Sequence, residues 1–474
     1  MTSQVVTWVL ATGLAIVVPR YLGPSLHGTV RLGQSLWAIA AILIAVGTDR
    51  SLQVKIAHHR GPGLDLVGPT LVIRTITFAV CATVLGVYAA VGSGDSTLVG
   101  VLAILGIGVL LSTWNDTFNT AFIGLEQMST PALVQAVWKL LNFAGVLLLI
   151  KLGSDVYGIV GMGVAASAVA LMILLVRFRH VGRLELRHWR GPAPRIIADG
   201  LPFMMNDSAV VLYQQIDVVV VSWVAGSEDV GWYATAELLA GSLIFPVTVI
   251  TLTIFPTLAR LHLHDRDGFT HLVKRTFSTL VMVAVPIGLG TTLVAPRFAP
   301  LLFGEEFRET GPVLAIFGPL IILTFGTILF ANVAQATGRV RSWILIVLAS
   351  ALATIPLDLL LVPWSRDRYG NGAIGAALAQ VITEAAQFAI GIWLVAPFLV
   401  RRDVVWRVAR ILGAGGVMFA IGWPIRHLFL PLVVLVCAVS YCLSLMLFRA
   451  IEDDDRRLIG KALGRVGVHS SRLS

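Results

Sequence analysis

The sequence predicts an all-α polytopic membrane protein with about 14 transmembrane helices, arranged as two pseudo-symmetric six-helix lobes plus two C-terminal helices. Of its 474 residues, 57% are hydrophobic and 13% are charged, and the mean hydropathy is +0.86. A soluble domain carries roughly 25% charged residues, so this much apolar surface cannot face water. Apolar runs recur along the whole chain, and glycine patterns recur in the same order in its two halves.

Apolar runs long enough to cross a bilayer lie between breaks formed by Gly, Pro and charged residues. In chain order they lie near 4–19, 27–48, 69–91, 97–123, 131–151, 154–177, 197–223, 229–256, 276–295, 311–336, 342–363, 371–398, 404–423 and 428–448. The first run is short and has no charged segment before it, so we expect no signal peptide.

Repeated glycines divide the chain. The glycines of "LGPSLHG" (22–28) correspond to those of "AGSEDVG" (225–231), and both pairs have the same separation. Two later matches follow in the same order: Gly124 with Gly338, and 158–165 with 372–379. A duplication of six helices explains these matches and keeps both halves in one orientation. The expected divisions are 1–193 for the first lobe with its linker, 194–400 for the second lobe, and 401–474 for the last helices and tail.

The distribution of basic residues predicts the orientation. Most of the 35 Lys and Arg residues lie in the tail and in the loops that follow even-numbered spans. Cytoplasmic loops carry such an excess, so both termini are expected in the cytoplasm. The net charge of +9 is then a topology signal and an attraction to anionic lipid headgroups, and we expect no nucleic-acid partner.

Several site classes are excluded. The three cysteines fall inside apolar runs, so no disulfide framework is implied, and no Cys or His spacing suits a metal. No Walker A sequence is present, which argues against ATP-driven transport by this chain. A membrane polymerase or ligase would need a large outer catalytic loop, and no expected outer loop exceeds about fifteen residues. We therefore expect a protein that is not an enzyme and has no cofactor.

Three stretches resemble a known family. "VPRYLGPSLHGTV" (18–30) resembles the opening signature of the polysaccharide-biosynthesis oligosaccharide flippases (Wzx type) of the multidrug/oligosaccharidyl-lipid/polysaccharide exporter superfamily. "QQIDVVVVSWVAGSEDVGWYATAELL" (214–239) resembles the start of their second half, and "YGNGAIGAALAQVITE" (369–384) their twelfth-helix start. Two features depart from the pattern: the first helix is shorter than usual, and Arg31 replaces a small or apolar residue.

The resemblance implies a flippase that translocates undecaprenyl-pyrophosphate-linked oligosaccharide across the bacterial inner membrane by alternating access. Its partners would be this polyprenyl-pyrophosphate-linked glycan, the lipid bilayer, and a polysaccharide polymerase and glycosyltransferases. The glycan carried and the oligomeric state stay open.

Basic residues in or beside the spans are the candidate pyrophosphate ligands, because a charge in a span normally faces a cavity or a partner. They are Arg20, Arg31, Arg50, Arg74 and Lys139. At the repeat-equivalent positions the second half has Trp223 and Ala234, so the cationic character belongs to the first lobe. Snorkelling to the headgroups is the alternative for Arg20 and Arg31, and a positive-inside anchor is the alternative for Arg74.

Acidic residues in the spans are the candidates for binding a coupling ion, which would be a proton or sodium. They are Asp116, Asp207, Asp217, Glu237 and Glu384. Internal salt bridging, for example between Asp116 and Lys139, is the alternative for this set.

Other transporter classes remain open. A multidrug/cation antiporter of the same superfamily would need an acidic cavity and usually has twelve spans. A lipid II flippase would also have fourteen. A scaffold without transport is a further alternative, because a sequence cannot show turnover.

Overall fold

The computed structural model describes residues 2–58, 63–93, 95–182, 184–186 and 189–450. Over these residues the chain forms helices and no strand. The first half contains α1 (Thr2–Ala45), α2 (Thr48–His58), α4 (Val67–Tyr88), the π-helix η1 (Ala89–Ser93), α5 (Ser96–Gly124), α6 (Ser129–Lys151) and α7 (Val156–Phe178). The second half contains α8 (Ala193–Val224), α9 (Ser227–His264), α10 (Arg266–Phe303), η2 (Glu305–Phe307), α11 (Thr310–Ala336), α12 (Val340–Tyr369) and α13 (Ala373–Val395). The chain continues with η3 (Pro397–Val400), α14 (Arg402–Ile425) and α15 (Leu430–Leu447).

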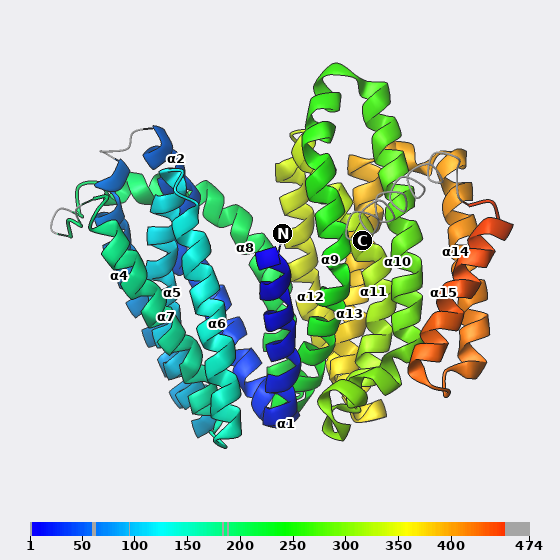
Figure 1. Ribbon diagram of the computed structural model, residues 1–474, viewed down its shortest axis with the longest axis horizontal. Helices are drawn as coiled ribbons and strands as arrows, with labels where there is room; N and C mark the ends of the chain where they lie inside the picture. Colours follow the sequence, from blue (N-terminus) through cyan, green and yellow to red (C-terminus); the bar gives the residue numbers. More distant parts are fainter. Residues whose placement is uncertain (1, 59–62, 94, 183, 187–188, 451–474) are drawn as a thin grey trace, which may run out of the picture. The chain divides into compact units, whose positions relative to one another are not determined.

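Thirteen of the described helices are long and apolar enough to cross a membrane. The difference from the expected fourteen comes from α1, which contains the first two expected spans (Figure 1). The two parts of α1 meet at Gly23, whose φ of 73° and ψ of 169° are not helical. Pro24 disfavours the α conformation for the residue before it, and glycine adopts a positive φ without a Cβ clash. The predicted fold class is therefore confirmed, with the first break made by a sharp kink.

The packing divides the chain into two compact units. The first consists of Met1–Leu238, Ala299–Val313 and Ile344–Thr383, and the second of Leu239–Phe298, Leu314–Trp343 and Glu384–Ser474. These units follow spatial packing, whereas the expected divisions at 193 and 400 follow the sequence duplication. The expected divisions therefore stay a prediction about the repeats.

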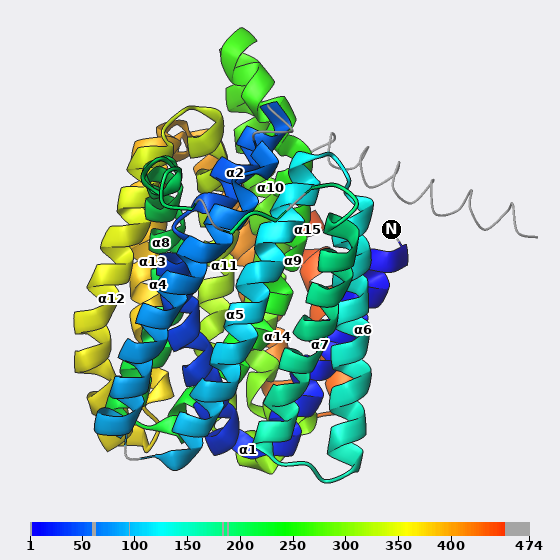
Figure 2. The ribbon, with the colours of Figure 1, turned by 90° about the vertical axis from the view of Figure 1, so that its left-hand side faces the viewer.

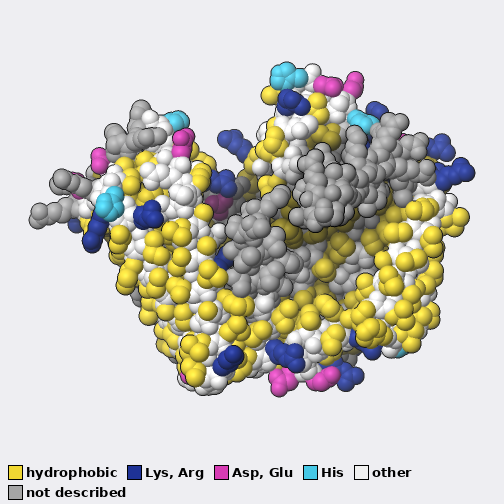
Figure 3. Space-filling view, viewed as in Figure 1, with side chains coloured by type: hydrophobic (Ala, Val, Ile, Leu, Met, Phe, Trp, Pro, Cys, Tyr) yellow, Lys and Arg dark blue, Asp and Glu magenta, His cyan; other side chains and the backbone are white. Residues whose placement is uncertain are grey.

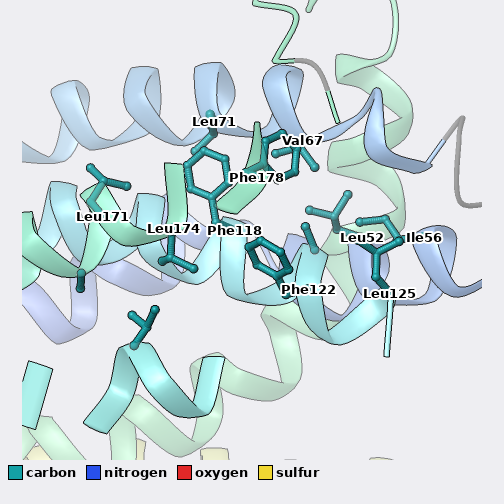
Figure 4. Close-up of a cluster of buried hydrophobic side chains, with 13 residues drawn as sticks. Leu52, Ile56, Val67, Leu71, Phe118, Phe122, Leu125, Leu171, Leu174 and Phe178 are labelled. Carbon is teal, nitrogen blue, oxygen red and sulfur yellow. The ribbon is translucent and has the colours of Figure 1, made fainter. Parts of the chain in front are cut away.

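Helices α4–α7 pack beside one another in the first unit (Figure 2). One core cluster joins α2, α4, α5 and α7 through large apolar side chains, including Phe118, Phe122 and Phe178 (Figure 4). Phe118 and Phe178 meet edge to face, with ring centroids 5.0 Å apart. Hydrophobic side chains cover the outward faces of these helices (Figure 3), as expected for surfaces that face lipid.

The second unit is held by aromatic packing and by its last two helices. Phe277 of α10 stacks on Phe330 of α11, with ring centroids 6.0 Å apart, and Phe388 of α13 packs against both. Helix α15 packs on α14, and Tyr441 of α15 donates a hydrogen bond to the Met282 carbonyl oxygen at 2.8 Å. The two helices expected to be added after the repeats thus form a pair attached to α10.

Candidate functional site

Each half of the sequence begins with an elbow that only glycine forms without strain. Gly23 interrupts α1 with a φ of 73°, and Gly226 lies between α8 and α9 with a φ of 99°. Both values lie in the region that L side chains rarely adopt. The two glycines matched by the sequence repeat thus share one unusual backbone conformation.

The two elbows lie against each other in the first unit. A Cβ on Gly28 would lie 1.7 Å from the Ser227 carbonyl oxygen, and one on Gly231 would lie 2.0 Å from the Pro24 carbonyl oxygen. Both distances are shorter than any van der Waals contact, so only glycine allows this approach of backbone to backbone. The second pair of repeated glycines therefore packs the two repeats together.

An ion pair lies just beyond this contact. Arg31 Nη2 is 2.9 Å from Glu237 Oε2, and a quarter of each side chain is exposed. Arg31 is a predicted phosphate ligand and Glu237 a predicted ion-coupling residue, and the structure brings them together. Sequence patterns cannot reveal a pair between residues this far apart along the chain.

Two other predicted phosphate ligands lie at the surface. Arg20 is exposed and donates a hydrogen bond of 3.4 Å to the Leu302 carbonyl oxygen. Arg50 is exposed at the start of α2. Both positions suit headgroup contacts as well as substrate contacts, so their role stays a prediction.

A cavity of about 280 Å³ lies within the first unit, lined by residues of α1, α2, α4 and α5. Its ionisable lining groups are Asp49, Arg74 and Asp116, and the Asp116 side chain is exposed to it. Among the lining residues, one formal positive charge thus faces two formal negative charges. These lining residues by themselves do not form the cationic cavity that the sequence predicts.

Arg74 lies buried at the edge of this cavity, with 1% of its surface exposed. Its guanidinium donates to the Thr48 hydroxyl at 2.7 and 2.9 Å and to the Thr117 hydroxyl at 2.9 Å. It also forms an ion pair with Asp49 at 2.7 Å. Because this group is occupied within the protein, it is better suited to ordering the cavity wall than to holding a ligand.

Lys139 lies half-buried in α6. No described carboxylate lies within 4.0 Å of its ammonium, so the alternative pairing with Asp116 is not formed in this structure. A half-buried ammonium in an apolar helix requires water or an anion. Unlike Arg31 and Arg74, Lys139 thus forms no ion pair with a described carboxylate.

A polar cluster is buried farther along the first unit. Asp217 is 3% exposed, and Tyr233 donates a hydrogen bond to its Oδ2 at 2.6 Å. The same tyrosine oxygen lies 3.0 Å from Gln380 Oε1, a second acceptor that faces the hydroxyl. Helix α9 thus links α8 to α13 through one tyrosine.

Asp358 of α12 belongs to the same cluster and is missing from the predicted set. It is fully buried, and it lies close enough to Asp217 for the two carboxylates to repel each other. Neither Asp358 carboxylate oxygen has a hydrogen-bond partner among the described residues, and Asp217 Oδ1 lacks one as well. The sequence did contain a signal, since Asp358 is the acidic residue inside the apolar run 342–363.

The other predicted acidic residues lie apart from this cluster. Glu384 is buried in the second unit and accepts a hydrogen bond from the Thr327 hydroxyl. Asp207 lies half-buried in α8. Within the described part of the chain, no group of three or more Asp, Glu, His or Cys side chains could hold a metal ion.

Comparison with known proteins adds a family. A sequence model of the family described as "Polysaccharide biosynthesis protein" matches residues 1–262. The curated protein named "Putative O-antigen transporter", from Escherichia coli (strain K12), is 24% identical over 226 residues, which are 46% of this chain. The match spans about half of that protein, 52% of its length.

Solved structures share the fold. One described as "Lipid II flippase MurJ, inward closed conformation" has a TM-score of 0.76 at 12% identity, over 94% of this chain and 98% of its own. An inward-facing multidrug resistance MATE family transporter has a TM-score of 0.68 at 15% identity, over 82% and 94%. At these identities the likeness concerns the fold alone.

Proposed function

Because the chain belongs to the polysaccharide biosynthesis protein family, we propose that it flips a polyprenyl-pyrophosphate-linked oligosaccharide from the cytoplasmic to the outer face of the bacterial inner membrane. Without a carrier, sugars and two phosphate charges would have to cross hydrocarbon, at a cost of several kcal/mol for each unsatisfied polar group. The proposed cycle is alternating access driven by a proton or sodium ion.

The observation that carries the mechanism is the contact between the two elbows. The Gly28–Ser227 and Gly231–Pro24 approaches and the Arg31–Glu237 ion pair all join the second span of one repeat, the part of α1 after Gly23, to the second span of the other, α9. Opening on this side requires these contacts to separate. The elbows are therefore the proposed outer gate.

Phosphate binding is assigned to Lys139 and Arg31. Lys139 has no carboxylate partner among the described residues and offers three N–H donors to an anion. Arg31 is held by Glu237 while the elbows are together. A pyrophosphate that takes over this guanidinium releases Glu237, because both anions compete for the same N–H donors. Substrate passage and gate opening are coupled in this way.

Ion coupling is assigned to Asp217 and Asp358. Among the described residues, three of their four carboxylate oxygens are buried without a hydrogen-bond donor, and the fourth accepts from Tyr233. Two buried carboxylates with so few donors are costly, so a proton or a sodium ion must accompany them. Tyr233 joins Asp217 to the gate helix α9 and lies about two turns after the elbow glycine Gly226. Binding or release of the ion thus acts next to the gate.

The test is flipping by the purified full-length protein in proteoliposomes. The probe is a short polyprenyl-pyrophosphate-linked oligosaccharide that begins in the inner leaflet. The readout is cleavage of its sugar by a glycosidase added outside the liposomes. Wild type exposes the sugar faster than empty liposomes do. Lys139→Ala lowers the rate about tenfold or more, since a charge-assisted contact of 1.4 kcal/mol or more is lost.

Lys151→Ala is the matched control, because Lys151 is an exposed lysine at the end of the same helix. It is expected to flip at the wild-type rate. Equal rates for Lys139→Ala and wild type would remove the assigned phosphate ligand. No acceleration over empty liposomes by wild type would overturn the flippase function itself.

One observation favours a second candidate, a multidrug/cation antiporter. The 280 Å³ cavity is lined by Asp49 and Asp116 as well as Arg74, which gives it net negative character. The same proteoliposomes decide between the two functions. Uptake of an organic cation dye against an ion gradient, lost in Asp116→Asn, would favour the antiporter.

A further inference from the structure

A second charged cavity lies within the second compact unit. It has a volume of about 630 Å³ and lies where α14 begins and α15 ends. Its lining comprises Arg402, Asp403, Trp406, Arg407, Arg410, Arg449 and Ala450. Arg402, Trp406 and Arg410 follow one another at intervals of four residues, so they share one face of α14. Arg449 follows α15, and its carbonyl oxygen lies 3.5 Å from Arg410 Nη1.

The lining has a clear excess of positive charge. Its described lining residues carry four guanidinium groups and one carboxylate, that of Asp403. Asp403 is already paired, since Lys274 Nζ lies 2.8 Å from its Oδ2. Lys274 also lines an adjoining cavity of about 110 Å³ together with His271 and Arg275. Basic side chains gather at this end of α14 and α15 in Figure 3.

Topology alone does not require such a cavity. Lys and Arg residues that only set the orientation in the membrane can each extend separately into water and headgroups. Here four like charges line one concavity, where they repel one another and an anion relieves the repulsion. Guanidinium groups bind phosphate with paired N–H donors, so phosphate is the matching anion.

The surroundings indicate that the phosphate belongs to a lipid. Trp406 is 57% exposed, as is common for tryptophan at the headgroup level. Below it, exposed apolar side chains continue on both helices: Leu412 on α14 and Leu443, Met446 and Leu447 on α15. Acyl chains can lie along this surface while the phosphate occupies the arginine cavity. A free phosphate ion has no acyl chains and would not contact this apolar surface.

We propose that this arginine cavity binds the phosphate of an anionic phospholipid from the adjacent leaflet, which is the cytoplasmic one by the distribution of basic residues. The lipid fixes the start of α14 and the end of α15 to each other and to the membrane surface. This site is separate from the elbows, from Lys139 and from the Asp217–Asp358 cluster, so it does not depend on the substrate that is carried.

The test measures lipid binding to the purified full-length protein by native mass spectrometry. The probes are phosphatidylglycerol and phosphatidylcholine with identical acyl chains. Wild type is expected to bind phosphatidylglycerol about tenfold more tightly. Arg402→Gln with Arg410→Gln is expected to lose most of that preference. Arg260→Gln with Arg266→Gln is the matched control, because both arginines are exposed in the same unit outside this lining and removing them lowers the net charge equally.

Retention of the preference by the Arg402/Arg410 variant would overturn the proposal, and so would an equal loss in the Arg260/Arg266 variant.

Two further arms test the identity of the ligand. Competition by millimolar inorganic phosphate would assign the cavity to a free ion. The acidic run Glu452–Asp455 follows the cavity residue Ala450 in the sequence. If lipid preference appeared only after these four residues are neutralised, the occupant would be the protein's own tail. Unchanged unfolding temperature in each variant excludes misfolding as the cause.

Discussion

At the scale of single residues, the buried carboxylate of Asp358 is a group whose energy depends on what is bound. It is fully buried in α12 and has no described hydrogen-bond partner on either oxygen. A buried acceptor without a partner costs about 1–3 kcal/mol, and a charged one costs more. Such a cost persists in a protein where a ligand or a proton offsets it in part of a working cycle.

Asp358→Asn is therefore expected to stabilise the protein and impair transport. In sodium-free buffer at alkaline pH, where neither a sodium ion nor a proton accompanies the carboxylate, the free energy of unfolding should rise by about 1–3 kcal/mol, because the uncompensated charge is removed. The dependence of flipping on the ion gradient should disappear. Asp367→Asn serves as control, since Asp367 is exposed near the end of the same helix. A gradient dependence that survives in Asp358→Asn would contradict the assignment.

Residue-level chemistry was partly predictable from the sequence. Charged side chains in apolar runs make Asp217, Glu237 and Arg31 candidates, because a charge in a span needs a partner or a cavity. Arg31 and Glu237 do pair and Asp217 is buried, while their roles stay predictions. The same rule applies to Asp358, which is missing from the predicted set. The Arg31–Glu237 pair and the internal hydrogen bonds of Arg74 could not be predicted, because they depend on which helices meet in space.

At the scale of elements, the elbows are the features that the sequence predicted best. Gly23 and Gly226 were matched by spacing alone, and both have the positive φ that explains their identity. The number of helices was predicted less well, because a kink and a loop produce the same break in an apolar run. The α1 kink at Gly23 therefore accounts for thirteen spans in place of fourteen.

Gly28→Ala tests the elbow contact. The new Cβ would lie 1.7 Å from the Ser227 carbonyl oxygen, so the two backbones must move apart. Overpacking of this kind costs about 1–3 kcal/mol, which we expect as a lower unfolding temperature of the purified protein. Flipping should also change, because the gate can no longer close fully.

Gly161→Ala is the matched substitution for this experiment. Gly161 lies within α7 and has open space where a Cβ would be placed. Alanine favours a helix interior over glycine by about 1 kcal/mol, so this variant should be as stable as wild type or more so. If both alanine variants behaved alike, the close approach of the elbows would have no functional weight.

At the scale of the whole molecule, composition and hydropathy were sufficient for the fold class. Long apolar runs must become helices in lipid, because only internal hydrogen bonds can satisfy the backbone there. Composition does not determine how the halves pack into compact units, since the repeats carry similar apolar patterns. The substrate is beyond composition as well, because it depends on a few polar side chains such as Lys139.

The orientation in the membrane is a prediction about the whole chain that can be measured directly. In a variant with its three cysteines replaced, Leu152→Cys lies in an expected outer loop and Leu263→Cys in an expected inner one. Both positions are well exposed, at 72% and 78%. A membrane-impermeant thiol reagent should label Leu152→Cys in intact cells and Leu263→Cys only after permeabilisation, since basic loops stay inside. The reverse pattern would invert the proposed direction of transport.

The contact between the elbows also bears on how this chain arose. Gly28 packs on Ser227, and Gly231 packs on Pro24. Under the repeat correspondence, Gly231 is the equivalent of Gly28 and Ser227 is the equivalent of Pro24, so the two contacts are one contact made twice in opposite senses. That reciprocity is the hallmark of an isologous interface, which two identical chains form about a two-fold axis. A half-length ancestor would therefore have met its own copy through this glycine, and gene fusion would have preserved a homodimer inside a single polypeptide. The later appearance of Arg31 in one half and Glu237 in the other would then have made the two halves chemically different at this interface.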